Sequence, residues 1–276
     1  MATFVECGKF RILVDPGASV AGVRYHLPPH PLEKWRLQKH LERIHLYMRS
    51  SHIIIITCFH SDHCSHLFTD AYRNKLVFMQ NPNVHLRAHR RKSAFHFINQ
   101  IKGITKDTIY MDSRTFEMQD LRIVFSTPVQ SNHKEKDDFV IPAALLYGSE
   151  VFLFSSNIEG LFQKSLVHWM IRQKPTFLYL DGPDTVSRNS AFEQDHLQKF
   201  FTLMEQLIIE TPLKNIIFDH HITRDSKWHH KMEPLLKLAQ ARNIIVQTAA
   251  EYRGEENNLF EARRKILYQD EPVTPS

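Results

Sequence analysis

The chain has 276 residues, of which 42% are hydrophobic and 24% charged, with 35 Lys and Arg against 30 Asp and Glu. This composition predicts a globular chain with a well-buried core, and it excludes collagen, a coiled coil and a disulfide scaffold. No apolar run approaches the roughly 18 residues of a membrane span, and the first ten residues contain no secretion signal, so we expect a cytoplasmic protein.

Short apolar runs bounded by turn residues predict strands at 11–14, 53–57, 75–79, 108–111, 121–126, 139–146, 151–155, 176–180, 215–218 and 243–247. Amphipathic periodicity predicts helices at 32–48, 87–101, 161–173, 192–209, 228–242 and 259–267. This alternation is typical of an α/β fold. Without a linker or a repeat, we expect one domain over 1–276, with a frayed tail at 269–276.

The densest chemical feature follows the predicted strand at 53–57. There the chain reads Cys58-Phe59-His60-Ser61-Asp62-His63-Cys64-Ser65-His66. Imidazole, carboxylate and thiolate groups all bind divalent metals, and loops beyond the carboxyl ends of strands often carry active sites. The segment therefore predicts a metal site. The alternative is a polar loop whose histidines cap the next helix.

This segment resembles the T-H-x-H-x-D-H signature of metallo-β-lactamase-fold hydrolases, with Cys58 in place of the first histidine. Three other segments fall in the matching order: Val14-Asp15-Pro16-Gly17, Phe154-Ser155-Ser156-Asn157 and Phe218-Asp219-His220-His221. The resemblance implies a four-layer αββα sandwich of the metallo-β-lactamase type. It also implies that metals lie between the edges of the two sheets and activate a water.

Within this superfamily the chain is most similar to an uncharacterised archaeal family. The matching segments are Ala2-Thr3-Phe4-Val5-Glu6, Arg24-Tyr25, Leu27-Pro28-Pro29, Asp219-His220-His221 and Glu261-Ala262-Arg263-Arg264-Lys265. That family usually carries another strand before Ala2. Either the natural start therefore lies further upstream, or an edge strand is missing.

Three positions depart from the two-metal pattern that the resemblance implies. Cys58 replaces a histidine, Gln130 stands where the third-loop histidine is expected (with His133 nearby as a substitute), and Asn157 replaces the bridging aspartate. The first site therefore keeps only His60 and Cys58. The second site keeps three ligands plus an open position, the composition of a mononuclear catalytic zinc site. Those ligands are Asp62, His63 and either His220 or His221.

We therefore expect one Zn²⁺, with two zinc ions, or Fe or Mn, as alternatives. Asp15 is expected to orient a ligand histidine by a hydrogen bond, and a plain turn is the equal alternative. Asp181 and Asp184 follow another predicted strand, but the adjacent Gly182-Pro183 favours a turn there.

The leading hypothesis is a metal-dependent hydrolase in which Asp62 accepts the proton of the attacking water. The main alternative is an inactive relative that serves as a binding or regulatory module. A third reading is a redox or metal-sensing site that uses Cys58 and Cys64.

The substrate is expected to be a small molecule or a phosphodiester. A nuclease-like activity on nucleic acid would use the basic residues Arg87, Arg90, Arg91 and Lys92. We favour the interpretation that these basic residues form a solvent-exposed helix face. Arg188 and Arg224 are candidates to clamp an anionic substrate.

Overall fold

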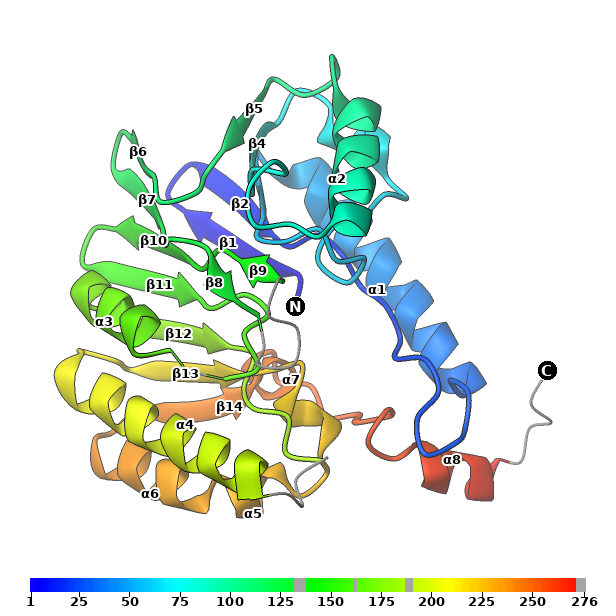
Figure 1. The fold of residues 1–276 in the computed structure, drawn as a ribbon, viewed down its shortest axis with the longest axis vertical. Helices are drawn as coiled ribbons and strands as arrows, with labels where there is room; N and C mark the ends of the chain where they lie inside the picture. Colours follow the sequence, from blue (N-terminus) through cyan, green and yellow to red (C-terminus); the bar gives the residue numbers. More distant parts are fainter. Residues whose placement is uncertain (132–137, 161–162, 187–190, 272–276) are drawn as a thin grey trace. The chain divides into compact units, whose positions relative to one another are not determined.

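The computed structural model describes residues 1–131, 138–160, 163–186 and 191–271. It has two mixed β-sheets with helices alongside them (Figure 1). Internal contacts divide the chain into two compact units. Unit 1 consists of Met1–Met79, Ala88–Ile109 and Asn258–Ser276, and unit 2 of Gln80–Arg87 and Tyr110–Asn257.

Unit 1 contains a five-stranded sheet in the order β1-β2-β3-β4-β5. The strands are β1 (Thr3–Cys7), β2 (Phe10–Val14), β3 (Ile53–Ile56), β4 (Leu76–Met79) and β5 (Asp107–Tyr110). β1 and β2 are antiparallel, whereas β2, β3 and β4 run parallel. All four isoleucines of β3 are buried, as expected for a central parallel strand covered on both faces. Because β2 and β3 are parallel, their carboxyl ends lie at the same edge of the sheet.

The helices of unit 1 are α1 (Pro31–Ser50), η1 (Thr69–Tyr72), α2 (Ala88–Ile101) and α8 (Arg264–Asp270). A capping box between His30 and Glu33 starts α1, with Pro31 at its first position. Glu33 also receives two hydrogen bonds from the buried Arg264 guanidinium, at 2.7 and 2.8 Å. This paired arrangement joins the C-terminal helix to the start of α1, more than 200 residues earlier in the chain.

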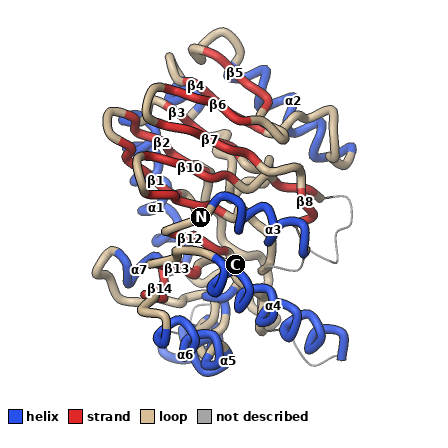
Figure 2. The backbone as a smooth tube through the Cα atoms, turned by 90° about the vertical axis from the view of Figure 1, so that its left-hand side faces the viewer, coloured by secondary structure: helices blue, strands red, loops and turns tan. Residues whose placement is uncertain are grey.

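Unit 2 contains a seven-stranded sheet in the order β14-β13-β12-β11-β10-β7-β6 (Figure 1). Strands are red and helices blue in Figure 2. The parallel strands are β11 (Glu150–Phe154), β12 (Phe177–Leu180), β13 (Asn215–Phe218) and β14 (Ile245–Thr248). The antiparallel part is formed by β6 (Thr115–Met118), β7 (Leu121–Phe125) and β10 (Ala143–Tyr147). A separate antiparallel pair joins β8 (Val129–Gln130) to β9 (Phe139–Val140).

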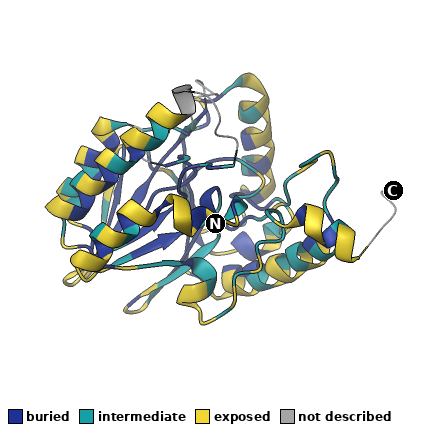
Figure 3. Cartoon of the chain, turned by 90° about the horizontal axis from the view of Figure 1, so that it is seen from below, coloured by how far each residue is buried: buried dark blue, intermediate teal, exposed yellow. Residues whose placement is uncertain are grey.

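The helices of unit 2 are α3 (Lys164–Gln173), α4 (Ala191–Glu210), η2 (Ile222–Arg224), α5 (Trp228–Lys231), α6 (Glu233–Ala241) and α7 (Ala249–Tyr252). α4 packs against both α3 and α6, and α6 and α7 contact β14. In Figure 3 the outer faces of the helices are exposed, while the strands are largely buried. The apolar faces of these helices therefore cover the sheet.

Most of the predicted elements are confirmed within a few residues, and the differences have local causes. The predicted strand at 139–146 is two strands in the structure. Pro142 lies between them and has no N–H to donate to a neighbouring strand. The predicted helix at 228–242 is two helices, broken at Met232 just before Pro234. The predicted helix at 259–267 begins only at Arg264 and runs to Asp270, so the first two residues of the expected tail are helical.

Strands β1, β6 and β8 and helix α7 are not among the predicted elements. The predicted helix start at 161–162 lies outside the described residues, as does most of the expected tail. Among the helices of the described chain, none is both long and apolar enough to cross a membrane.

Candidate metal centre

Asp15 organises the centre of unit 1. It follows β2 directly and its side chain is completely buried. Its carboxylate accepts hydrogen bonds from the backbone N–H and the Oγ1 hydroxyl of Thr57, at 2.8 and 2.6 Å. It also accepts one from Nδ1 of His63 at 2.7 Å. The contact expected of Asp15 with a histidine is therefore present, and it ties the end of β2 to the loop after β3.

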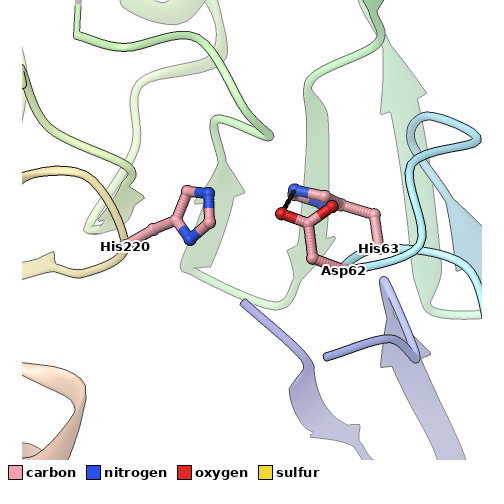
Figure 4. Close-up of side chains that lie close together, drawn as sticks. All are labelled: Asp62, His63 and His220. Carbon is pink, nitrogen blue, oxygen red and sulfur yellow. Dashed lines mark ion pairs between the residues drawn. The ribbon is translucent and has the colours of Figure 1, made fainter. Parts of the chain in front are cut away.

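His63 and Asp62 present two ligand atoms side by side (Figure 4). His63 Nε2 lies 3.7 Å from Asp62 Oδ2, a separation too long for a hydrogen bond. Because Nδ1 of His63 donates to Asp15, a neutral His63 ring carries its lone pair on Nε2. Two ligands of one tetrahedral zinc lie roughly 3.3–3.6 Å apart when each bond is about 2.0–2.2 Å. The donor types and their spacing thus fit a divalent metal.

Gly17 allows the loop to pack this closely. A Cβ atom at Gly17 would lie 2.6–2.7 Å from backbone atoms of Asp62, His63 and Cys64. Such distances are closer than side chains tolerate, so residue 17 must lack a side chain for the loop to keep its path. Gly17 therefore has a direct steric role at the centre.

Electrostatics in unit 1 favour a bound cation. Burial disfavours the charged His63 ring, but Cys58, Asp15 and Asp62 outweigh it and raise the pKa of His63 well above its ordinary value. Burial also opposes the charged form of Asp62, but the His63 and His60 rings lower its pKa overall. The acidic groups thus stabilise a positive charge at the His63 ring. When no metal is bound, that charge is a proton on the ring.

The remaining predicted residues of unit 1 lie around this pair. The His60 ring centroid is 6.3 Å from that of His63, and the His60 carbonyl accepts the N–H groups of His63 and Cys64. Cys58 and Cys64 are buried free thiols, and burial raises the pKa of both. Neither cysteine is therefore a ready thiolate in the metal-free chain.

In unit 2 the two late histidines follow β13 and have different surroundings. His220 has a left-handed backbone with φ of 64°, and its ring centroid is 4.4 Å from that of His221, edge to face. His221 donates from Nδ1 to Asp181 Oδ1 at 2.7 Å, and its backbone N–H donates to the same oxygen at 3.1 Å. Ligand atoms of Asp181, His220 and His221 all lie within 4.8 Å of one another.

Asp181 has a larger structural role than the sequence indicated. The Gly-Pro pair after it favoured a turn, yet Asp181 is fully buried and holds His221. The available signal was its position directly after strand β12, which matches the position of Asp15 after β2. Glu159, which lies 3.7 Å from His221, was also missed, because it stands two residues beyond the matching segment that ends at Asn157.

Three further candidate residues of unit 2 are described, Gln130, Asn157 and Arg224. Gln130 ends β8, and its backbone carbonyl accepts a hydrogen bond from Gln163. Asn157 is buried, and its Oδ1 accepts no hydrogen bond from the described residues. Arg224 is half-buried at the end of η2. His133 and Arg188 lie outside the described residues.

The basic residues proposed to contact nucleic acid are partly on α2. Arg91 and Lys92 are exposed on that helix, Arg90 is half-buried on it, and Arg87 precedes it in unit 2. Their role as a nucleic-acid surface stays a prediction.

Solved structures define the class of protein. The metallo-β-lactamase-fold protein YhfI from Bacillus subtilis matches 90% of this chain and 88% of its own, with a TM-score of 0.53 at 12% identity. Igni18, a metallo hydrolase from Ignicoccus hospitalis, matches 90% of each chain with a TM-score of 0.51 at 13% identity. Zn²⁺-bound PqqB from Methylobacterium extorquens matches 88% of this chain and 83% of its own, with a TM-score of 0.50 at 13% identity. The protein has a metallo-β-lactamase fold, as predicted.

Sequence relatives then give the family. A UPF0282 protein of Metallosphaera sedula is 33% identical over 271 residues, covering 97% of this chain and 87% of the relative. A UPF0282 protein of Korarchaeum cryptofilum is 31% identical over 277 residues, covering 100% of this chain and 92% of the relative. No family model matches the chain. The chain belongs to the archaeal UPF0282 family, which confirms the resemblance seen in the sequence.

Proposed function

We propose that this protein is a hydrolase that uses a metal-activated water, with Asp62 and His63 as ligands in unit 1. The observation that carries the proposal is the buried Asp15–His63 pair, which presents His63 Nε2 at 3.7 Å from Asp62 Oδ2. Metal-binding histidines in proteins are commonly held in this way by a carboxylate on the other ring nitrogen. The metallo hydrolase Igni18 shares the fold and supports a metal-dependent hydrolysis, and Zn²⁺-bound PqqB shares the fold and supports zinc as the metal.

A late histidine would add the third ligand of this metal. Between the two candidates we propose His220, because both ring nitrogens of His221 face carboxylates of its own unit, Asp181 and Glu159. His60 and Cys58 would form a weaker or vacant further site. Three protein ligands and an open position match a catalytic zinc site.

When bound, the metal lowers the pKa of its water to about 7 and polarises the substrate. Asp62 has a lowered pKa and is therefore ionised near neutral pH, so it can accept a proton from the attacking water. Asp15 holds the His63 ring in one orientation throughout. The two carboxylates thus have separate roles: Asp62 accepts a proton, and Asp15 fixes the orientation of the His63 ring.

A direct test assays the zinc-loaded chain on bis(p-nitrophenyl) phosphate and on an acyl thioester, the two bond classes that we would screen first. Hydrolysis of either substrate that falls at least a hundredfold in Asp62→Asn would support the proposal. Asp70→Asn is the matched control, because Asp70 is an exposed aspartate eight residues later in the same unit. Hydrolysis that is equal in wild type and Asp62→Asn would exclude the assigned role.

Failure of the metal-loaded chain to hydrolyse any substrate would favour the inactive binding module. The replacement of the expected bridging carboxylate by Asn157 is the feature that supports that alternative.

A further inference from the structure

Unit 2 contains a second histidine whose ring is fixed by a buried carboxylate. Asp181 Oδ1 accepts both Nδ1–H and the backbone N–H of His221. With its proton on Nδ1, a neutral His221 has its lone pair on Nε2, which is the form that binds metals. The direction of that lone pair is set by two hydrogen bonds.

Glu159 places a carboxylate next to that nitrogen. Its Oε1 lies 3.7 Å from His221 Nε2, the same separation as between Asp62 and His63 in unit 1. The backbone N–H of Glu159 donates to Asp181 Oδ2 at 2.7 Å, and Glu159 has a left-handed φ of 44°. One buried aspartate therefore positions both the imidazole and the carboxylate.

Asp181 itself is unsuited to be a metal ligand, although its oxygens lie near both histidines. Oδ1 already accepts two hydrogen bonds from His221, and Oδ2 accepts the Glu159 N–H. Asn157 offers only a neutral amide, a poor ligand for Zn²⁺. Glu159, two residues after Asn157, places a carboxylate beside His221 Nε2 instead.

We propose that His221 and Glu159 form a second divalent-metal site that lies entirely within unit 2, with Asp181 as its positioning residue. Imidazole and carboxylate together suit zinc, manganese or iron, and solvent would complete the coordination. The site shares no ligand with Asp62, His63 or His220. It therefore does not depend on the proposed hydrolase function.

The test is a Zn²⁺ titration of the full-length, metal-stripped chain against a chromophoric chelator. We expect two equivalents for wild type and one for Glu159→Gln. Glu150→Gln is the matched control and should keep both, since Glu150 is an exposed carboxylate at the start of β11 that pairs with Lys214. Two equivalents of unchanged affinity in Glu159→Gln would overturn the proposal.

Asp62→Ala separates this proposal from the proposed function. We expect Asp62→Ala to lose the other equivalent and the double variant Asp62→Ala/Glu159→Gln to bind none. If wild type binds one zinc that only Asp62→Ala removes, the unit 2 site is wrong and the proposed function stands. If only Glu159→Gln removes that zinc, the unit 2 site stands and the metal site of the proposed function is wrong.

Asp181→Asn tests the positioning role. The amide would lose the charge that aligns the His221 ring, and loss of such a partner weakens metal binding about 10–100-fold. We expect that weakening in the unit 2 equivalent alone, with the unit 1 equivalent unchanged. Equal affinity at both sites in Asp181→Asn would contradict the assignment.

Discussion

In each unit, a buried aspartate directly after a parallel strand accepts a hydrogen bond from Nδ1 of a histidine. The distance from Nδ1 to the carboxylate oxygen is 2.7 Å for both Asp15–His63 and Asp181–His221. The surroundings of the two histidines differ. His63 is completely buried beside a thiol and two carboxylates, which raise its pKa well above the ordinary value. His221 is buried beside two carboxylates, Asp181 and Glu159, and the ring of His220. The comparison indicates that the aspartate sets ring orientation, while the neighbouring charges set how strongly each centre attracts a cation.

The largest expected effect comes from removing the organising carboxylate. Asp15→Ala leaves the Thr57 N–H, the Thr57 hydroxyl and His63 without their common acceptor in a buried site. Breaking a buried charged network of this kind costs about 3–5 kcal/mol of unfolding free energy. Urea unfolding of the metal-free chain measures it, and a loss under about 1 kcal/mol would contradict the account.

Asp181→Ala is the matched variant in unit 2. Asp181 also accepts three hydrogen bonds and is also fully buried, so we expect a loss of similar size. A much smaller loss for Asp181→Ala alone would show that the two centres are not built on the same principle.

Much of this arrangement could be predicted from the sequence, because strand ends are marked by short apolar runs. The strand Ile53–Ile56 and the polar residues after it placed His63 and Asp62 at a sheet edge, and Val14-Asp15-Pro16-Gly17 indicated the aspartate. Glu159 could not be predicted. Its place beside His221 depends on a left-handed loop residue and on Asp181, which are set by tertiary hydrogen bonds rather than by a local pattern.

The glycines after the two aspartates sharpen the comparison. Gly17→Ala would force backbone atoms of the Asp62–Cys64 loop to move, and overpacking of this kind costs about 1–3 kcal/mol. Gly182→Ala would meet the Ile222 side chain at 2.7 Å and adopt a φ of +78°, so we expect a similar loss.

Thermal or urea unfolding of both glycine variants gives these values. Gly22→Ala is the control, because a Cβ there has no atom within 4 Å, and its effect should stay within about 0.5 kcal/mol. An equally small effect of Gly17→Ala would show that the loop is less tightly held than the structure indicates.

The pH dependence of the metal-free chain distinguishes the centres further. The pKa of His63 is higher in the folded than in the unfolded chain, so folding binds a proton there. The stability from that proton is fully present below the unfolded pKa of about 6.5 and is lost as pH rises through the folded pKa. The slope is at most about 1.4 kcal/mol per pH unit.

Urea unfolding between pH 6 and pH 9, with wild type and His63→Gln side by side, measures this contribution. We expect the pH-dependent loss of stability to be smaller in His63→Gln. Because zinc must displace the same proton, zinc affinity of the wild type should also rise with pH over this range. Identical pH profiles of stability in the two chains would contradict the charge environment described for His63.

The most direct test of the central claim is the metal content per chain, measured by elemental mass spectrometry after exposure to mixed Zn, Fe and Mn. We predict that wild type retains metal and that Asp62→Ala, which changes a partly exposed side chain, holds about one equivalent less. Equal metal content in the two chains, or a wild-type chain that retains none, would contradict the assignment of Asp62 and His63 as a metal centre.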